Sequence, residues 1–165
     1  MLFHLICYTG YMAKRRFVTK SANSTRKLGE ILGEETRGYF NRKKTGFCVS
    51  LEGELGSGKT VFAKGFARGL GIVRPVTSPT FVLAKRYPVT KSRFRNFWHV
   101  DCYRLKNARE LKTIGYENMV RDPYAVLAIE WGDRIRKYLP KEALRIVFQH
   151  EKKSRTTRIL TFYGA

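Results

Sequence analysis

The clearest chemical signal in the chain is a run of eight residues with a fixed arrangement of Gly, Lys and Thr. The run reads Gly53-Glu54-Leu55-Gly56-Ser57-Gly58-Lys59-Thr60. Two glycines separated by four residues and followed by Lys and Thr form the pattern of a phosphate-binding loop. We therefore predict that the chain binds a nucleoside triphosphate here. The alternative is a chance glycine-rich turn.

The residue types of this run have direct physical roles in such a loop. Glycines allow backbone N–H groups to point toward an anion, and a helix beginning near Gly58 adds the positive end of its dipole. Lys59 would reach the β- and γ-phosphates, and the hydroxyl of Thr60 would be one ligand of a magnesium ion. The predicted phosphate-binding residues are Gly53, Leu55, Gly56, Ser57, Gly58, Lys59 and Thr60.

Two carboxylates, Asp101 and Glu130, each follow a strand-like segment. In open α/β sheets ligands collect at the carboxyl ends of the strands. Glu130 is expected to hold magnesium directly or through water and to orient the attacking water, while Asp101 holds a magnesium-bound water or lies near the γ-phosphate. The alternative for each is a surface carboxylate paired with an arginine.

Three further features lie near these carboxylates in the sequence. His99 shares a strand face with Asp101 because side chains repeat every two residues, and a structural histidine is favoured over a catalytic base. Trp131 is expected in the core, with a cover over the nucleotide as the alternative. Ser78-Pro79-Thr80 fits an ordinary turn or a mobile segment that senses the γ-phosphate.

The elements that must position these residues alternate between helices and strands. Apolar periodicity predicts helices over 21–39, 61–70, 108–119 with a break at Gly115, and 133–138. Strands are predicted over 47–52, 80–87, 96–101, 124–129, 144–148 and 158–162, and the second and third could form a hairpin. This order predicts an α/β fold with a mixed, mainly parallel sheet flanked by helices.

Length and composition favour one globular domain with polyanionic partners. The chain has 165 residues, 43% of them hydrophobic, and a formal net charge of +20. That charge favours tRNA or another nucleic acid, with a general basic bias or an acidic protein partner as the alternative. No apolar run approaches the ~20 residues of a membrane span, so no membrane partner is expected. Three cysteines without paired spacing predict neither a disulfide framework nor a zinc site, and favour the cytoplasm.

The domain is predicted over residues 15–165, preceded by an extension over 1–14. This extension is expected to be either non-native, with Met12 as the true start, or disordered. An organelle-targeting segment is the alternative, since Lys and Arg are plentiful and no acidic residue precedes Glu30.

Four sequence blocks together resemble the TsaE (YjeE) family over about residues 15 to 163. They are the glycine loop, Thr77-Ser78-Pro79-Thr80-Phe81, His99-Val100-Asp101-Cys102-Tyr103-Arg104-Leu105 and Ile129-Glu130-Trp131. The resemblance implies a P-loop ATPase that works with TsaD and TsaB to make N6-threonylcarbamoyladenosine in tRNA. It implies that this ATPase uses ATP and Mg²⁺, is slow without its partners, and does not itself transfer the threonylcarbamoyl group.

The resemblance also implies roles for individual residues. Lys59 would contact phosphate, Thr60 and Glu130 would bind magnesium, and Asp101 would support catalysis. Further implied positions are Thr80 as a switch-like threonine, Trp131 beside the nucleotide, and, by a looser alignment, Arg155 near the nucleotide. Val61 departs from the second threonine of many relatives, which removes one hydroxyl contact to the α-phosphate.

Two other functions are alternatives to the interpretation as a TsaE-like ATPase. A small-molecule kinase of the same fold would need an acceptor pocket and an arginine-rich lid, and no such lid stands out in the sequence. A nucleic-acid-binding module that keeps the loop as a relic would not depend on Lys59.

Overall fold

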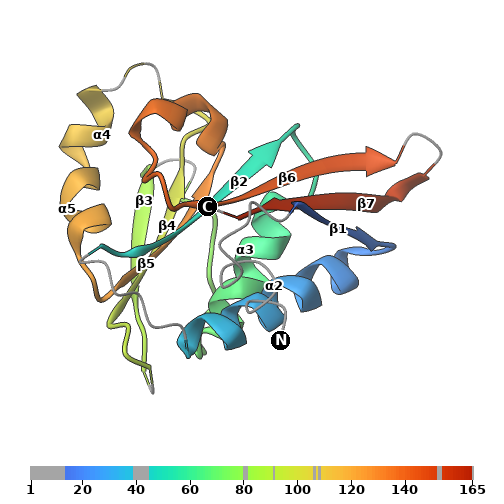
Figure 1. Ribbon diagram of the computed structural model, residues 1–165, viewed down its shortest axis with the longest axis horizontal. Coiled ribbons are helices and arrows are strands. Elements are labelled where there is room, and N and C mark those ends of the chain that lie inside the picture. The colour runs from blue at the N-terminus through green and yellow to red at the C-terminus, as the bar shows by residue number, and fades with distance from the viewer. Residues whose placement is uncertain are drawn as a thin grey trace.

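The chain folds around a seven-stranded mixed sheet with helices on both faces (Figure 1). The structure is a computed structural model that describes residues 14–38, 45–79, 82–90, 92–105, 107, 109–151 and 154–164. The strands are β1 (Lys14–Thr19), β2 (Phe47–Gly53), β3 (Ala84–Pro88), β4 (Asn96–Asp101), β5 (Ala125–Glu130), β6 (Leu144–Glu151) and β7 (Ser154–Tyr163). The helices are α2 (Ala22–Arg37), α3 (Lys59–Gly69), α4 (Arg109–Thr113), α5 (Tyr116–Arg121) and the 3₁₀ helix η1 (Gly132–Tyr138).

The central strands of the sheet are parallel and the edges are antiparallel. The strand order is β1-β7-β6-β2-β5-β4-β3. β2 lies between β6 and β5 and is parallel to both, and β4 is parallel to β5. The β6–β7 and β3–β4 pairs are antiparallel, as is β1 on β7. The carboxyl ends of β2, β4 and β5 therefore meet at one edge, where ligands are expected in such sheets.

The buried strand β2 separates two hydrophobic clusters because its side chains alternate between the faces of the sheet. Phe47, Val49 and Leu51 belong to the cluster covered by α2 and α3. Cys48 belongs to the other cluster, to which α4, α5 and η1 contribute. Figure 1 shows the α2–α3 pair and the α4–α5 pair on opposite sides of the sheet.

Helices α2 and α3 pack closely because glycines occupy their contact. A Cβ atom added to Gly29 of α2 would lie 2.3 Å from the carbonyl oxygen of Phe62. A Cβ on Gly65 of α3 would lie 2.0 Å from the carbonyl oxygen of Arg26. This close crossing fixes α3, whose first residue is Lys59, against α2 and so positions the end of the glycine loop.

The predicted α/β architecture is confirmed, including the hairpin between β3 and β4. The predicted break at Gly115 is also confirmed: its φ of 70° separates α4 from α5. β1 was not predicted, because its pattern is dominated by exposed basic residues and it is held through backbone pairing with β7. Residues 1–13 lie outside the described residues, and Lys14 is already the first residue of β1.

Within the described ranges, every helix is too short or too polar to cross a bilayer.

The thiols of Cys48 and Cys102 are free, and burial raises the pKa of each to about 12.

Candidate active site

The glycine loop joins the end of β2 to the first turn of α3 and uses backbone conformations that glycine adopts readily. Gly53, Gly56 and Gly58 have φ values of 134°, 76° and 103°. These lie in the region where a side chain is strained. At Gly58 a Cβ atom would also come within 2.9 Å of Nε of Arg158, from β7. The local sequence therefore permits a turn that an ordinary residue at these positions would resist.

The ammonium group of Lys59 lies inside this loop. Its Nζ donates hydrogen bonds of 2.7 Å to the carbonyl oxygens of Gly53 and Glu54, and it lies 3.7 Å from the centre of the Trp131 ring. Burial lowers the pKa of Lys59, and the charges of nearby carboxylates, Glu130 first among them, act in the opposite direction. The loop thus holds a cation that an anionic ligand can attract away from the loop carbonyls.

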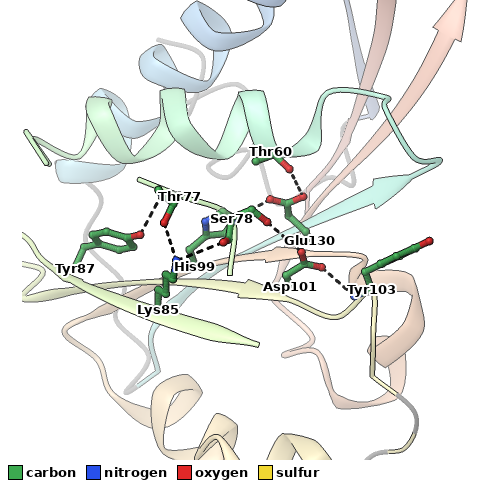
Figure 2. Close-up of polar contacts among 9 residues, drawn as sticks. All are labelled: Thr60, Thr77, Ser78, Lys85, Tyr87, His99, Asp101, Tyr103 and Glu130. Atoms are coloured by element: carbon green, nitrogen blue, oxygen red, sulfur yellow. Dashed lines mark hydrogen bonds and ion pairs between the residues drawn. The ribbon is translucent and has the colours of Figure 1, made fainter. Parts of the chain in front are cut away.

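Glu130 ends β5 and connects the loop helix to the sheet (Figure 2). The hydroxyl of Thr60 donates a 2.7 Å hydrogen bond to Oε2 of Glu130. Nε2 of His99 lies 2.7 Å from the other oxygen, Oε1. Both carboxylate oxygens are therefore engaged, and Glu130 is almost completely buried.

Asp101 lies beside Glu130 at the end of the neighbouring parallel strand. The two residues are directly paired in the β4–β5 register. Oδ1 of Asp101 accepts the backbone N–H of Tyr103 at 3.0 Å, and Oδ2 accepts the hydroxyl of Ser78 at 3.3 Å. Two buried carboxylates thus meet where the sequence predicts them, at the carboxyl ends of adjacent strands.

The segment that contains Thr77 and Ser78 is tied to β3 as well as to Asp101. Nζ of Lys85 donates to Oγ1 of Thr77 at 2.7 Å, and the backbone N–H of Thr77 donates to the hydroxyl of Tyr87 at 3.2 Å. Figure 2 shows this chain of contacts running from Tyr87 toward Asp101. Ser78, the first residue of the predicted switch segment, is therefore tied to Asp101, and the preceding Thr77 is tied to β3, whereas Thr80 lies outside the described residues.

Trp131 follows Glu130 and closes one side of the site. Its φ of 60° turns the chain from β5 into η1, and its ring packs at 4.9 Å from the ring of Tyr103. A cavity of about 280 Å³ lies between these rings and the glycine loop. It is lined by Leu55, Gly56, Gly58, Lys59, Thr60, Val61, Ser78, Asp101, Tyr103, Glu130 and Trp131.

Comparison with known proteins assigns the chain to a family. The family model described as "Threonylcarbamoyl adenosine biosynthesis protein TsaE" matches residues 19–159. The chain belongs to the TsaE family. Its glycine loop, Asp101 and Glu130 all lie within the matched region of this TsaE-family chain.

Individual relatives agree with this family. The protein named tRNA threonylcarbamoyladenosine biosynthesis protein TsaE from Bacillus subtilis is 41% identical over 106 residues, which cover 64% of this chain and 63% of the relative. The protein of the same name from Treponema pallidum is 36% identical over 131 residues, which cover 79% and 88%. The crystal structure of YdiB from Bacillus subtilis superposes with a TM-score of 0.66 at 28% identity, covering 94% of this chain and 88% of that one.

The oxygen atoms of Thr60 and Glu130, which line the cavity, fit a magnesium ion. In the described part of the chain no three His, Cys, Asp or Glu side chains gather into a metal cluster. Magnesium in a phosphate-loop site does not need one, since it takes one or two protein oxygens and completes its shell with phosphate oxygens and water. Oγ1 of Thr60 and Oε2 of Glu130, 2.7 Å apart, are suitable ligands of this kind.

A third buried carboxylate, Glu52, supports the strand that leads into the loop. It accepts two hydrogen bonds of 2.9 Å from Arg145, one of 2.7 Å from Arg136 and one of 3.1 Å from Ser50. Burial alone would raise the pKa of Glu52, but the hydrogen bonds and charges of these arginines lower it below its ordinary value. This cluster ties β2, β6 and η1 together directly before Gly53.

The structure brings together most of the predicted site residues, but two of them lie outside the residues that it describes. Lys59, Thr60, Asp101, Glu130 and Trp131 surround one cavity. Thr80 and the side chain of Arg155 lie outside the described part of the chain.

Trp131 is partly buried against the core, which is the expected environment, and its ring also contacts the ammonium of Lys59. Arg158, which lies against Gly58, was not predicted as a site residue. The sequence signal for it was a basic residue in the last predicted strand. The direct contact of His99 with Glu130 was not predicted either, although the alternation of His99 with Asp101 indicated a shared strand face.

Proposed function

We propose that this TsaE-family chain binds and hydrolyses ATP with Mg²⁺ at residues 53–60 and so serves the formation of N6-threonylcarbamoyladenosine in tRNA. It acts on a complex of TsaD and TsaB and does not transfer the threonylcarbamoyl group itself. The observation that carries the proposal is the 2.7 Å hydrogen bond between Thr60 and Glu130, formed beside Lys59 at the first turn of α3. The relatives carry the name of this tRNA modification.

Phosphate binding is the first task of the loop residues. The backbone N–H groups of the loop and the positive end of the α3 dipole favour an anion at this place. Lys59 exchanges its contacts with the carbonyls of Gly53 and Glu54 for phosphate oxygens. Because its ammonium is largely withdrawn from water, the attraction to phosphate is stronger than at the surface.

Hydrolysis is the task of the two carboxylates. Thr60 and Glu130 would hold the magnesium ion, which would supply positive charge to neutralise the phosphates of ATP. Glu130 and its neighbour Asp101 orient the water that attacks the γ-phosphate, directly or through other waters. The hydrogen bond between Ser78 and Asp101 would link the segment before Thr80 to the site of the γ-phosphate.

The net charge of +20 supports direct contact with tRNA during this work. Phosphate contacts release counterions, so the affinity for tRNA should fall steeply with salt. A filter-binding titration of tRNA across salt concentrations tests this. Affinity that does not change with salt would contradict the contact.

The tRNA substrate and the free thiols of Cys48 and Cys102 together favour the cytoplasm as the place of action.

The experiment that tests the proposed function is ATP turnover by the purified chain, alone and with TsaD and TsaB from the same source. We expect slow turnover alone, a rise with the partners, and loss in Lys59→Ala and Glu130→Ala. If the partners do not change the rate of ATP turnover and a small molecule is phosphorylated, the chain is a small-molecule kinase and this proposal is wrong.

A further inference from the structure

His99 is a completely buried polar side chain that contacts the carboxylate of Glu130. It lies in β4, two residues before Asp101, and its ring stacks against Phe97 with a 6.3 Å distance between ring centres. His99 is absent from the lining of the cavity that Lys59 and Glu130 share. It therefore reaches the site through Glu130 and does not face a ligand in that cavity.

The hydrogen bonds of His99 indicate which ring nitrogen carries the proton. Nε2 lies 2.7 Å from Oε1 of Glu130, whereas Nδ1 has no hydrogen-bond partner among the described residues. A proton on Nδ1 would be a buried donor without an acceptor and would leave Nε2 facing a carboxylate oxygen as a second acceptor. The proton therefore belongs on Nε2, and His99 donates to Glu130.

This donation constrains the orientation of the Glu130 carboxylate. The last torsion of a glutamate side chain is broad, so a carboxylate held at one oxygen can still rotate. His99 holds Oε1 while Thr60 contacts Oε2, which fixes both ends of the group. Groups that hydrogen-bond to metal ligands in this way set ligand orientation and affinity in metal sites.

We propose that His99 is a positioning residue whose Nε2–H holds Oε1 of Glu130 and thereby keeps Oε2 directed at Thr60 and the magnesium ion. This inference rests on the proposed function, since it assigns His99 to the same site. His99 is not a general base in this proposal, because Nε2 contacts Glu130 and Nδ1 is enclosed in the protein.

The test compares His99→Gln, which retains an N–H donor on a side chain of similar reach, with His99→Leu, which retains bulk but has no donor. ATP binding is measured calorimetrically with and without Mg²⁺, and thermal unfolding is measured in parallel. We expect wild type and His99→Gln to bind ATP more tightly when Mg²⁺ is present. In His99→Leu this magnesium effect should shrink about tenfold or more, while the affinity without Mg²⁺ stays within about twofold.

Three outcomes overturn the inference in distinguishable ways. An unchanged magnesium effect in His99→Leu shows that the hydrogen bond does not matter. Equal losses in both variants show that the ring packing matters instead. Absence of the magnesium effect in wild type contradicts the proposed function itself, and the role of His99 falls with it.

A measurement on wild type alone covers the case in which the variants do not fold. The ¹⁵N chemical shifts of the His99 ring distinguish a protonated from an unprotonated nitrogen. We expect the proton on Nε2 in the ligand-free protein. A proton on Nδ1 alone would remove the donor to Glu130 and overturn the inference.

Discussion

Two buried glutamates on neighbouring strands, Glu52 of β2 and Glu130 of β5, have contrasting surroundings. Glu52 accepts hydrogen bonds from two arginines, Arg136 and Arg145. Glu130 contacts a hydroxyl and His99, and within the described residues it forms no ion pair of its own with Lys or Arg. A buried carboxylate needs compensating positive charge. Glu52 finds that charge within the protein, whereas Glu130 is suited to receive part of it from a bound cation.

The two carboxylates also face opposite sides of the sheet. Glu52 follows Cys48 and Ser50 on the face that η1 covers, and Glu130 follows Val126 and Ala128 on the face that α3 covers. The sheet thus separates a cluster that holds the architecture together from one that contacts the loop helix. The difference teaches that burial of a charge alone does not identify a functional residue; its partners do.

The largest effect is expected for Glu130→Gln. ATP turnover should fall about 100-fold or more, because the amide keeps the shape of the side chain but loses the negative charge that we propose holds magnesium. Thermal stability should change little. Steady-state turnover and a thermal unfolding curve measure both quantities, and Glu52→Gln is the matched control at the other carboxylate. Turnover that survives in Glu130→Gln would remove the distinction between the two glutamates.

The opposite pattern is expected for Glu52→Gln. The free energy of unfolding should fall by about 2 kcal/mol, because the amide loses the negative charge and one of the two oxygens that accept hydrogen bonds from Arg136 and Arg145. Turnover at a temperature where the variant remains folded should stay near the wild-type value. Urea unfolding measures the stability. An unchanged unfolding midpoint would show that the arginine cluster contributes nothing to the fold.

The stability that the Glu52 cluster contributes should depend on pH and be lost in acid. The pKa of Glu52 is lower in the folded protein than its ordinary value of 4.5, so the stabilisation is complete above that value and is lost as pH falls through the lower folded pKa. Urea unfolding of wild type and Glu52→Gln between about pH 3 and pH 7 measures this. Their stabilities should converge at the acid end, and a difference that stays constant with pH would contradict the assignment.

The smallest effects separate the two arginines of the cluster. The side chain of Arg145 is 33% exposed and makes two hydrogen bonds to Glu52, whereas that of Arg136 is 56% exposed and makes one. Arg136→Ala should cost roughly 0.5 kcal/mol, as an exposed pair does, and Arg145→Ala more. Urea unfolding of both variants gives the order, and a larger loss in Arg136→Ala would reverse it.

Much of the site could be predicted because its residues follow local rules. The loop motif is contiguous in the sequence, and Asp101 and Glu130 stand at strand ends that the apolar runs before them reveal. The contact of Thr60 with Glu130 joins residues 70 positions apart, and nothing local encodes its geometry. The same holds for Glu52, whose arginines come from η1 and β6.

The fold shows the same division between local and long-range information. Continuous apolar residues predict buried strands such as β5, and Gly115 predicts the break between α4 and α5. Half of the residues of β1 are basic and most are exposed, and the strand gains its structure by pairing with β7. The glycine contacts between α2 and α3 likewise depend on a partner that the sequence does not specify locally.

The most direct test of the account is calorimetric binding of ATP, with and without Mg²⁺, to wild type, Lys59→Ala and Lys64→Ala. Lys64 is the matched control because it is an exposed lysine of the same helix. The account predicts that wild type and Lys64→Ala bind ATP more tightly with Mg²⁺, and that Lys59→Ala loses binding by about 100-fold or more. Equal binding by Lys59→Ala and wild type would contradict nucleotide binding at the glycine loop.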